Sequence, residues 1–408
     1  MPESPLLRYL ERKSGLIAYV GLDGNIYTID QGGGKQTAVT TDADLSDPNN
    51  AFLIYQFPTW SRNGQRLAYV GIRGGRTQQT AASLYLMDFS EKKLIEAFRS
   101  DTELPFFLYW SPDNERISFL TSSPDSEAMT LRLASFGLDS AEILDSGRPY
   151  YWVWSPDGQR VVVHTGGSSD RNPEARVSSL TIGNEIRENR LNLNPHRFQS
   201  PDWSPDGSQL LLAGKNQQGQ GVLYQANLRG TPSRQLATFD QAIAFSWSPD
   251  GKFVAYVAVE QEVSVVLGQL SVLRMESLEQ VPTPDEEVLA FFWSPDSEKI
   301  AYLVPFLDPE SEGEVSGENL LLELKVLEVK DGETRTLTTF RPSDSFISIL
   351  PFFDQYARAA TIWSPDSENV VIAALEPGGV PTIWVVPVSG RLPPRFITAG
   401  EIAFWSWK

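Results

Sequence analysis

The sequence predicts an all-β fold, an eight-bladed β-propeller built from four-stranded antiparallel blades. The tetrapeptide Trp-Ser-Pro-Asp occurs six times, and two further Trp-Ser pairs share its setting. Successive tryptophans from the first pair to the seventh lie 50, 44, 49, 44, 46 and 70 residues apart. A period in the forties with strand-like content is typical of propeller blades. The repeated tryptophans are Trp60, Trp110, Trp154, Trp203, Trp247, Trp293, Trp363 and Trp405.

A tight turn is expected after each Trp-Ser strand. Pro presets φ near −65°, Asp bonds its own backbone, and a residue such as Gly158 or Asn114 accepts the left-handed conformation that closes a hairpin. We therefore interpret the repeated aspartates as turn formers rather than as a ring of metal ligands. They are Asp113, Asp157, Asp206, Asp250, Asp296 and Asp366.

Three more strands complete each predicted blade. A continuous apolar run follows the turn, as at residues 254–257, which indicates a strand covered on both faces. A third strand such as 221–225 and a more polar fourth such as 234–237 come next. Each blade is thus an antiparallel meander.

The two ends of the chain are expected to share one blade. Residues 16–20 and 25–29 match second and third strands, and the missing first strand is found at 402–406. Joining them closes the ring and leaves no open edge between its first and last blades. We predict one domain over residues 1–408, with blades at 402–408 plus 14–45, 55–100, 105–146, 149–194, 197–240, 242–284, 288–341 and 357–400.

We interpret the repeated tryptophans as core between blades rather than as a stacking surface for sugars or bases. A lone blade cannot bury both faces, and each Trp removes roughly 150–250 Å² from water. At ~25 cal/mol per Å² this is an upper bound of about 4–6 kcal/mol per residue.

Composition restricts the partner and the compartment. The net charge of −18 disfavours nucleic acid and favours a basic protein, a cationic peptide or a divalent ion, or simply keeps a strand-rich body soluble. No membrane span or leader is visible, so we expect a soluble monomer, cytoplasmic as given and periplasmic if a signal peptide was removed. The absence of cysteine fits any compartment.

The six intact repeats, each followed by an aliphatic-aromatic strand, resemble the propeller repeats of TolB and its relatives over residues 14–408. The resemblance implies a protein-interaction platform. TolB has six blades and an additional N-terminal α/β domain, so this chain is not expected to be TolB itself.

The sequence also argues against two classes of enzyme. The chain has no Gly-x-Ser-x-Gly elbow, which excludes the propeller-bearing serine peptidases. Oligogalacturonate lyases, which carry similar repeats, use several histidines, whereas this chain has only His164 and His196. We interpret His164 as structural and His196, in a loop at a channel mouth, as the better functional candidate. The sequence favours a non-catalytic role with no cofactor and no metal.

Two departures from the repeat point to a working surface. The long gap before Trp363 contains an acidic insertion at 305–319 and an apolar, aromatic one at 344–358, both on one face by strand order. The second is expected either to dock a partner or to plug the channel. The segments leading into the first strands are aromatic and form either a partner patch or more core: Tyr55, Phe57, Phe106, Phe107, Tyr150, Tyr151, Trp152 and Phe198.

The predicted function is therefore a protein-protein interaction scaffold that binds a protein or peptide partner of basic character. The alternatives are a metal-dependent lyase or hydrolase sited in the channel and a sugar- or peptide-binding module without turnover. The candidate binding residues are Phe346, Leu350, Phe352, Phe353, Asp354, Tyr356, Arg358, Tyr150, Tyr151 and His196.

Overall fold

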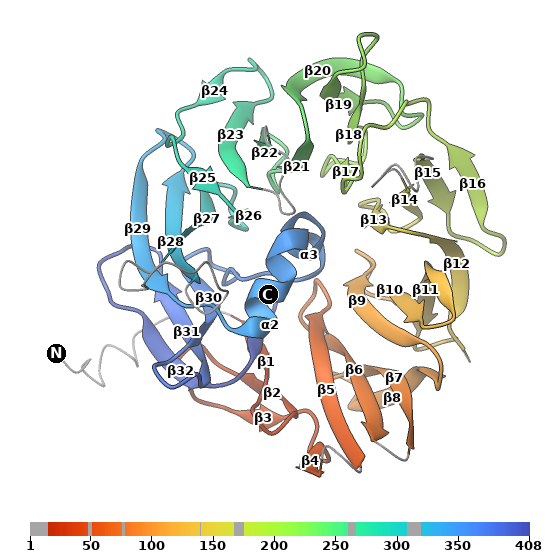
Figure 1. Cartoon of the computed structure of the whole chain (residues 1–408), viewed down its shortest axis with the longest axis vertical. Helices are drawn as coiled ribbons and strands as arrows, with labels where there is room; N and C mark the ends of the chain where they lie inside the picture. The colour runs from red at the N-terminus through yellow and green to blue at the C-terminus, as the bar shows by residue number, and fades with distance from the viewer. Residues whose placement is uncertain are drawn as a thin grey trace.

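The predicted eight-bladed propeller is confirmed: the described residues form eight antiparallel sheets arranged in a ring (Figure 1). The computed structural model describes residues 15–47, 51–75, 78–138, 140–166, 175–259, 267–307 and 320–408. The sheets are numbered here as blades 1 to 8 in chain order. Most of the acidic insertion predicted at 305–319 lies outside the described residues.

Blades 1, 3 and 4 are the predicted four-stranded meanders, whereas blades 2 and 6 each contain a fifth strand. Blade 1 combines β33 (Ile402–Trp405) with β1 (Ile17–Val20), β2 (Ile26–Ile29) and β3 (Thr37–Ala38). Blade 2 contains β4 (Asp44–Asp47), β5 (Ala51–Trp60), β6 (Arg66–Gly75), β7 (Gln78–Asp88) and β8 (Lys93–Ser100). Blade 3 contains β9 (Leu104–Trp110), β10 (Arg116–Ser123), β11 (Ser126–Ser135) and β12 (Glu142–Gly147). Blade 4 contains β13 (Tyr150–Trp154), β14 (Arg160–Thr165), β15 (Arg176–Thr181) and β16 (Arg187–Arg190).

Blades 5 to 8 complete the ring. Blade 5 contains β17 (Asp202–Trp203), β18 (Leu210–Lys215), β19 (Gly221–Ala226) and β20 (Pro232–Phe239). Blade 6 contains β21 (Ala242–Trp247), β22 (Phe253–Val259), β23 (Gly268–Arg274), β24 (Gln280–Val281) and β25 (Glu287–Val288). Blade 7 contains β26 (Ala290–Trp293), β27 (Lys299–Leu307), β28 (Leu320–Glu328) and β29 (Thr334–Phe340). Blade 8 contains β30 (Asn369–Leu375), β31 (Pro381–Pro387) and β32 (Arg395–Ala399).

Blade 8 departs from the four-stranded pattern because its first strand is reduced to single bridges. Trp363 bridges Val370 within the blade, and Thr361 bridges Trp405 of blade 1. The segment that leads into this position is helical instead of extended, with α2 (Asp344–Ile349), the 3₁₀ turn η2 (Leu350–Phe352) and α3 (Phe353–Ala359).

The ring closes as predicted, through β33. This strand pairs antiparallel with β1 in a register that places Ile17 opposite Trp405 and Val20 opposite Ile402. Closure supplies the first strand of blade 1 from the end of the chain, so β1 has hydrogen-bonded neighbours on both sides.

The repeated turns use their Ser and Asp side chains as predicted for hairpin chemistry. In the turn of blade 7, Ser294 Oγ donates to Asp296 at 2.5 Å and accepts from the Lys299 amide at 2.9 Å. The residue that closes each turn has a positive φ, 68° at Gly158 and 65° at Asn114. The turns define one face of the ring, called here the turn face. Strand order places the connections between blades on the opposite face, called here the helical face because α2 enters from it.

Three of the turns carry a side chain, not glycine, at this left-handed position, and each side chain reaches the preceding blade. Asn114 Oδ1 accepts from the Asn63 amide at 2.9 Å. Ser297 Oγ accepts from the Asp250 amide at 3.0 Å, and Ser367 Oγ accepts from the Asp296 amide at 3.1 Å. These bonds link neighbouring turns.

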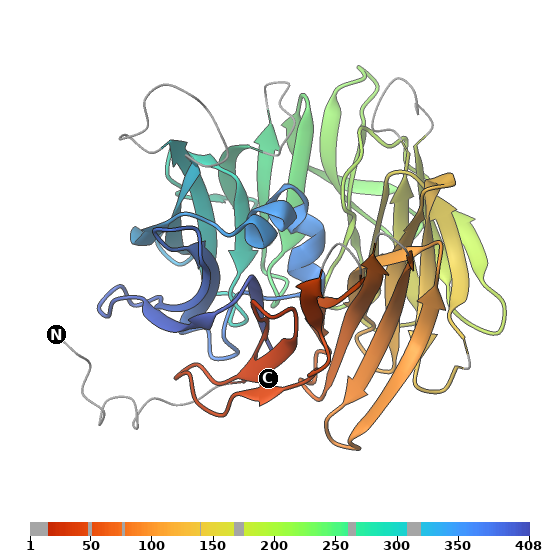
Figure 2. The ribbon, with the colours of Figure 1, turned by 60° about the horizontal axis from the view of Figure 1, so that its bottom comes forward.

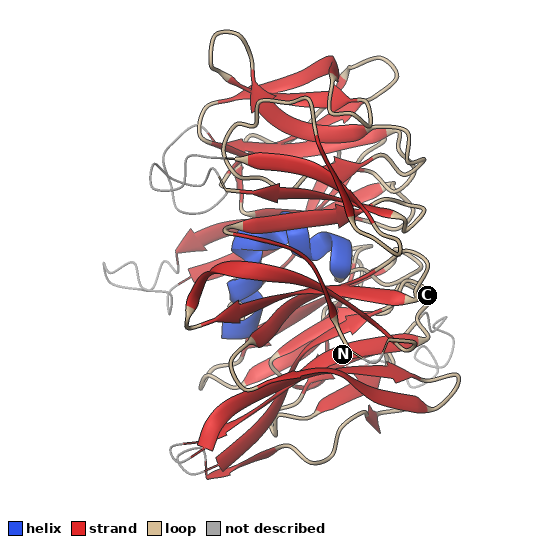
Figure 3. Ribbon diagram, turned by 90° about the vertical axis from the view of Figure 1, so that its right-hand side faces the viewer, coloured by secondary structure: helices blue, strands red, loops and turns tan. Residues whose placement is uncertain are grey.

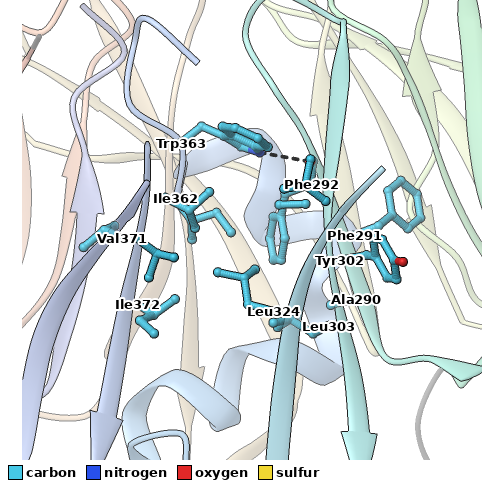
Figure 4. Packing of buried hydrophobic residues seen from close by; sticks show 14 of the residues in the cluster. Ala290, Phe291, Phe292, Tyr302, Leu303, Leu324, Ile362, Trp363, Val371 and Ile372 are labelled. Carbon is cyan, nitrogen blue, oxygen red and sulfur yellow. Dashed lines mark hydrogen bonds between the residues drawn. The ribbon is translucent and has the colours of Figure 1, made fainter. Parts of the chain in front are cut away.

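The tryptophans pack in the seams between blades, in accordance with the core interpretation. Seven of the eight repeated tryptophans are buried, and Trp293 is half-buried. In the seam between blades 7 and 8, Trp363 Nε1 donates to the Phe292 carbonyl at 2.9 Å, and Ile362 and Leu324 belong to the same buried cluster (Figure 4). Trp110 Nε1 makes the corresponding bond to Thr59 of blade 2.

Candidate binding surface beside the channel helices

The insertion at 344–358 forms helices that occupy the centre of the ring (Figures 1 and 2). Seen from the side, they are surrounded by strands (Figure 3). Ser343 caps α2 by accepting from the Phe346 amide at 3.2 Å, and it donates to the Glu401 carbonyl at 2.6 Å. Pro351 lies in η2, where the chain turns from α2 into α3. The structure places this segment inside the channel, which is the position expected of a plug.

Apolar side chains hold the insertion against several blades at once. Phe346, Leu350 and Phe353 are buried. The ring of Phe353 packs edge-on against Phe291 of blade 7 with centroids 5.1 Å apart. On the other side of α3, Tyr356 meets Phe107 of blade 3 at 4.9 Å. The helix is therefore clamped between blades on opposite sides of the channel.

Polar side chains of α3 bind the innermost strands. Gln355 accepts from the Trp152 amide at 3.2 Å and donates to the Trp152 carbonyl at 2.8 Å, as a neighbouring strand would. Arg358 forms a buried ion pair with Asp202 and donates to Ser200 Oγ at 3.3 Å. Asp202 also accepts from the Trp247 amide of blade 6 at 2.9 Å. One helix thus joins blades 4, 5 and 6.

Burial changes the electrostatics of this cluster. Burial raises the pKa of Asp354 to about 6, although the nearby Arg358 and three backbone N–H groups oppose the shift. Burial likewise raises the pKa of Asp202, again against the attraction of Arg358. Asp354 is therefore a carboxyl group that changes charge close to neutral pH.

Two cavities lie beside the helices, one toward each face. The turn-face cavity has a volume of about 330 Å³, with Asp202, Asp354 and Arg358 among its lining residues and prolines of the repeated turns at its mouth. The helical-face cavity has a volume of about 430 Å³ and lies between α2, α3 and blades 1 to 3. Both volumes lie in the range of small-ligand pockets, roughly 300–1,000 Å³.

The structure brings some of the predicted binding residues together and separates others. Asp354, Tyr356 and Tyr151 lie close enough for the charges of the first two to affect the pKa of Tyr151, which burial raises well above its usual range. Phe352 is the exposed aromatic residue of the insertion, with 48% of its surface accessible. Tyr150 is buried and donates to Asp145 at 2.8 Å, and His196 packs against Phe239 at 5.3 Å.

The aromatic segments that lead into the first strands of the blades lie partly in the core and partly in the wall of a cavity. Tyr55, Phe107, Tyr150 and Trp152 are buried, as expected of core. Tyr55 and Phe107 nevertheless line the helical-face cavity, together with the half-buried Phe57.

Sequence reasoning missed Glu401 and Ser348, which line the helical-face cavity. Glu401 immediately precedes β33, and Ser348 lies on the exposed side of α2. A carboxyl group before the closing strand was the available signal, because closure places that strand beside the insertion.

The structure describes no metal centre within the resolved parts of the chain: no three His, Cys, Asp or Glu side chains of the described ranges converge as a metal site. His164 is buried, its Nδ1 lies 2.9 Å from the Gln199 carbonyl, and burial lowers its pKa to about 4. This is the structural setting expected for it. Among the described helices, none has the length and hydropathy of a membrane span.

Comparison with known proteins supports the fold. No known protein family matches the chain, and no curated protein matches it either. A eukaryotic initiation factor is similar in structure, with a TM-score of 0.53 and 13% identity, and the match covers 97% of this chain and 98% of that one.

Two further structures show the range of this likeness. A prolyl endopeptidase matches with a TM-score of 0.55 at 12% identity over 85% of this chain, which spans only 49% of the peptidase. TolB from Acinetobacter baumannii matches with a TM-score of 0.39 at 15% identity, covering 83% of this chain and 81% of TolB. The two matches with TM-scores above 0.5 show, at these identities, the β-propeller fold alone.

Proposed function

We propose that this propeller is a non-catalytic interaction scaffold that receives a protein or peptide partner on its helical face. The observation that carries the proposal is the helical-face cavity, an opening of about 430 Å³ walled by apolar residues of α2, α3 and three blades. Pockets with apolar walls and few polar groups are the usual sites where proteins accept an anchoring group.

The clamped insertion supports this role because it supplies one wall of the cavity. Phe353, Gln355 and Arg358 fix α3 to blades 4 to 7, so Tyr356 and Ile349 meet a partner in a pre-set arrangement. A rigid receiving surface lowers the ordering cost of association.

Site-specific photocrosslinking in the native host tests the proposal. A benzophenone amino acid replaces Ser348, which is exposed and lines the cavity, and in a matched control it replaces Ser277, which is exposed on blade 6 away from it. We expect a discrete protein adduct from position 348 that is missing from position 277, identified by mass spectrometry. The proposal is wrong if position 348 gives no adduct or gives the same adducts as position 277.

A further inference from the structure

The walls of the helical-face cavity are mostly apolar. Leu22 of the β1–β2 turn, Ile54 of β5, Leu108 of β9 and Ile349 of α2 line it. Tyr356 adds an aromatic surface from α3. Such walls favour an aliphatic or aromatic side chain, because each Å² removed from water on both partners contributes ~25 cal/mol.

The charged group in the lining of the cavity is acidic. Glu401 is the charged residue among the described lining residues, and it carries a carboxyl group. Burial and the neighbouring Asp344 raise the pKa of Glu401, while a hydrogen bond from Ser345 opposes the shift. Asp23 and Asp44 directly adjoin the lining residues Leu22 and Leu45 in the chain.

The nearest cation along α3 is not available to balance these carboxylates. Arg358 precedes the lining residue Ala359, but its guanidinium is paired with Asp202 and donates to the Phe245 carbonyl at 3.3 Å, beside the turn-face cavity. A cation brought by a ligand would therefore meet Glu401 in a partly buried setting, where opposite charges attract more strongly than in open water.

We infer that the helical-face cavity recognises a peptide segment in which a large apolar side chain lies next to a Lys or Arg, the apolar group filling the cavity and the cation pairing with Glu401. This inference rests on the proposed function and adds the chemistry of the partner. The charge complementarity, not the apolar walls alone, selects a basic segment over a neutral or acidic one.

Selection from a phage-displayed random dodecapeptide library tests the inference with the full chain as bait. Four baits are compared: the wild type, Glu401→Gln, the cavity-filling Ser348→Trp and the matched surface control Ser277→Trp. Melting curves that coincide with wild type establish that each variant is folded. Enriched peptides are then synthesised, and binding is measured by fluorescence anisotropy.

The inference predicts that wild type and Ser277→Trp enrich a large apolar residue within three positions of Lys or Arg. Replacing that cation by Glu should weaken binding about 10-fold, the equivalent of ~1.4 kcal/mol. Glu401→Gln should still select the apolar residue but lose the basic preference, and Ser348→Trp should select neither.

The selection distinguishes a failure of the inference from a failure of the proposed function. Enrichment of apolar peptides without basic residues, or a basic preference that Glu401→Gln retains, overturns the inference and leaves the proposed function standing. Enrichment of the same peptides by Ser348→Trp, or no enrichment by wild type, overturns the proposed function together with the inference.

Discussion

At the scale of single residues, the repeated turns show why a residue other than glycine can occupy a left-handed position. Ser297 has a φ of 64°, a conformation that costs an ordinary residue about 1–2 kcal/mol. Its hydroxyl accepts from the Asp250 amide of the preceding blade, which offsets that cost. The hydrogen bond between the blades therefore offsets the backbone strain in the turn.

We expect Ser297→Ala to lower the free energy of unfolding by about 1–2 kcal/mol, since it keeps the strain and loses the bond. Ser297→Gly loses the bond but also relieves the strain, so it should lie within about 0.5 kcal/mol of wild type. Urea unfolding followed by tryptophan fluorescence distinguishes the three proteins. Equal destabilisation by Ala and Gly would show that strain has no part in the balance.

The raised pKa of Asp354 makes the stability of the protein depend on pH. Its pKa rises from 3.8 to about 6 on folding, so the unfolded chain binds fewer protons between these values and stability falls as pH rises through them. Asp354→Asn removes this loss and keeps an oxygen for the Gln355 amide. The variant should be more stable than wild type by about 2 kcal/mol at pH 7 and nearly equal at pH 4. A stability difference that is the same at both pH values contradicts the assignment.

Residue patterns predicted the turns because their chemistry is local: Pro, Asp and Gly act within four positions of one another. The partners of Asn114, Ser297 and Ser367 could not be predicted, because the links cross between blades more than 40 residues apart. The burial of Asp354 and Arg358 depends equally on distant blades. The sequence therefore indicated Asp354 and Arg358 as candidates without showing that α3 turns them toward blade 5.

At the scale of elements, the insertion before Trp363 is the main feature that the repeat did not predict. Its composition indicated a plug or a docking surface, and the structure places it in the channel as α2, η2 and α3. A capping signal was present, since Ser343 precedes Asp344 and the apolar positions Phe346 and Leu350 follow at helical spacing. The strand-like repeat in the rest of the chain gives no indication of a helix at this position.

The buried ion pair between Arg358 and Asp202 is expected to hold α3 against blade 5. Arg358→Met should lower the free energy of unfolding by about 3 kcal/mol, because Asp202 is left buried without its ion-pair partner. Adding Asp202→Asn should recover part of the loss. The exposed Arg391→Met serves as the matched control, with an expected change below about 0.5 kcal/mol. Chemical denaturation of the four proteins tests this, and a double variant less stable than Arg358→Met refutes the clamp.

At the scale of the whole molecule, the ring, its blade count and its closure followed from the sequence because one motif recurs and the two chain ends complement each other. The reduced first strand of blade 8 did not follow, since Trp363 and Ser364 keep the motif even though the preceding residues are helical. The helical-face cavity and the setting of Glu401 depend on the return of β33 to blade 1, because Ile402 and Phe404 line that cavity.

Closure is therefore the claim on which the rest of the account depends, and the absence of cysteine makes it directly testable. Tyr19 and Ala403 lie opposite each other across β1 and β33. The account predicts that Tyr19→Cys with Ala403→Cys forms an intramolecular disulfide on oxidation of the folded protein, seen as faster migration without reductant and as one linked peptide by mass spectrometry. Tyr19→Cys with Ala244→Cys of blade 6 should form none. Failure of the first pair to link, with both single variants folded, or equal linking by the control pair, would contradict the closed ring.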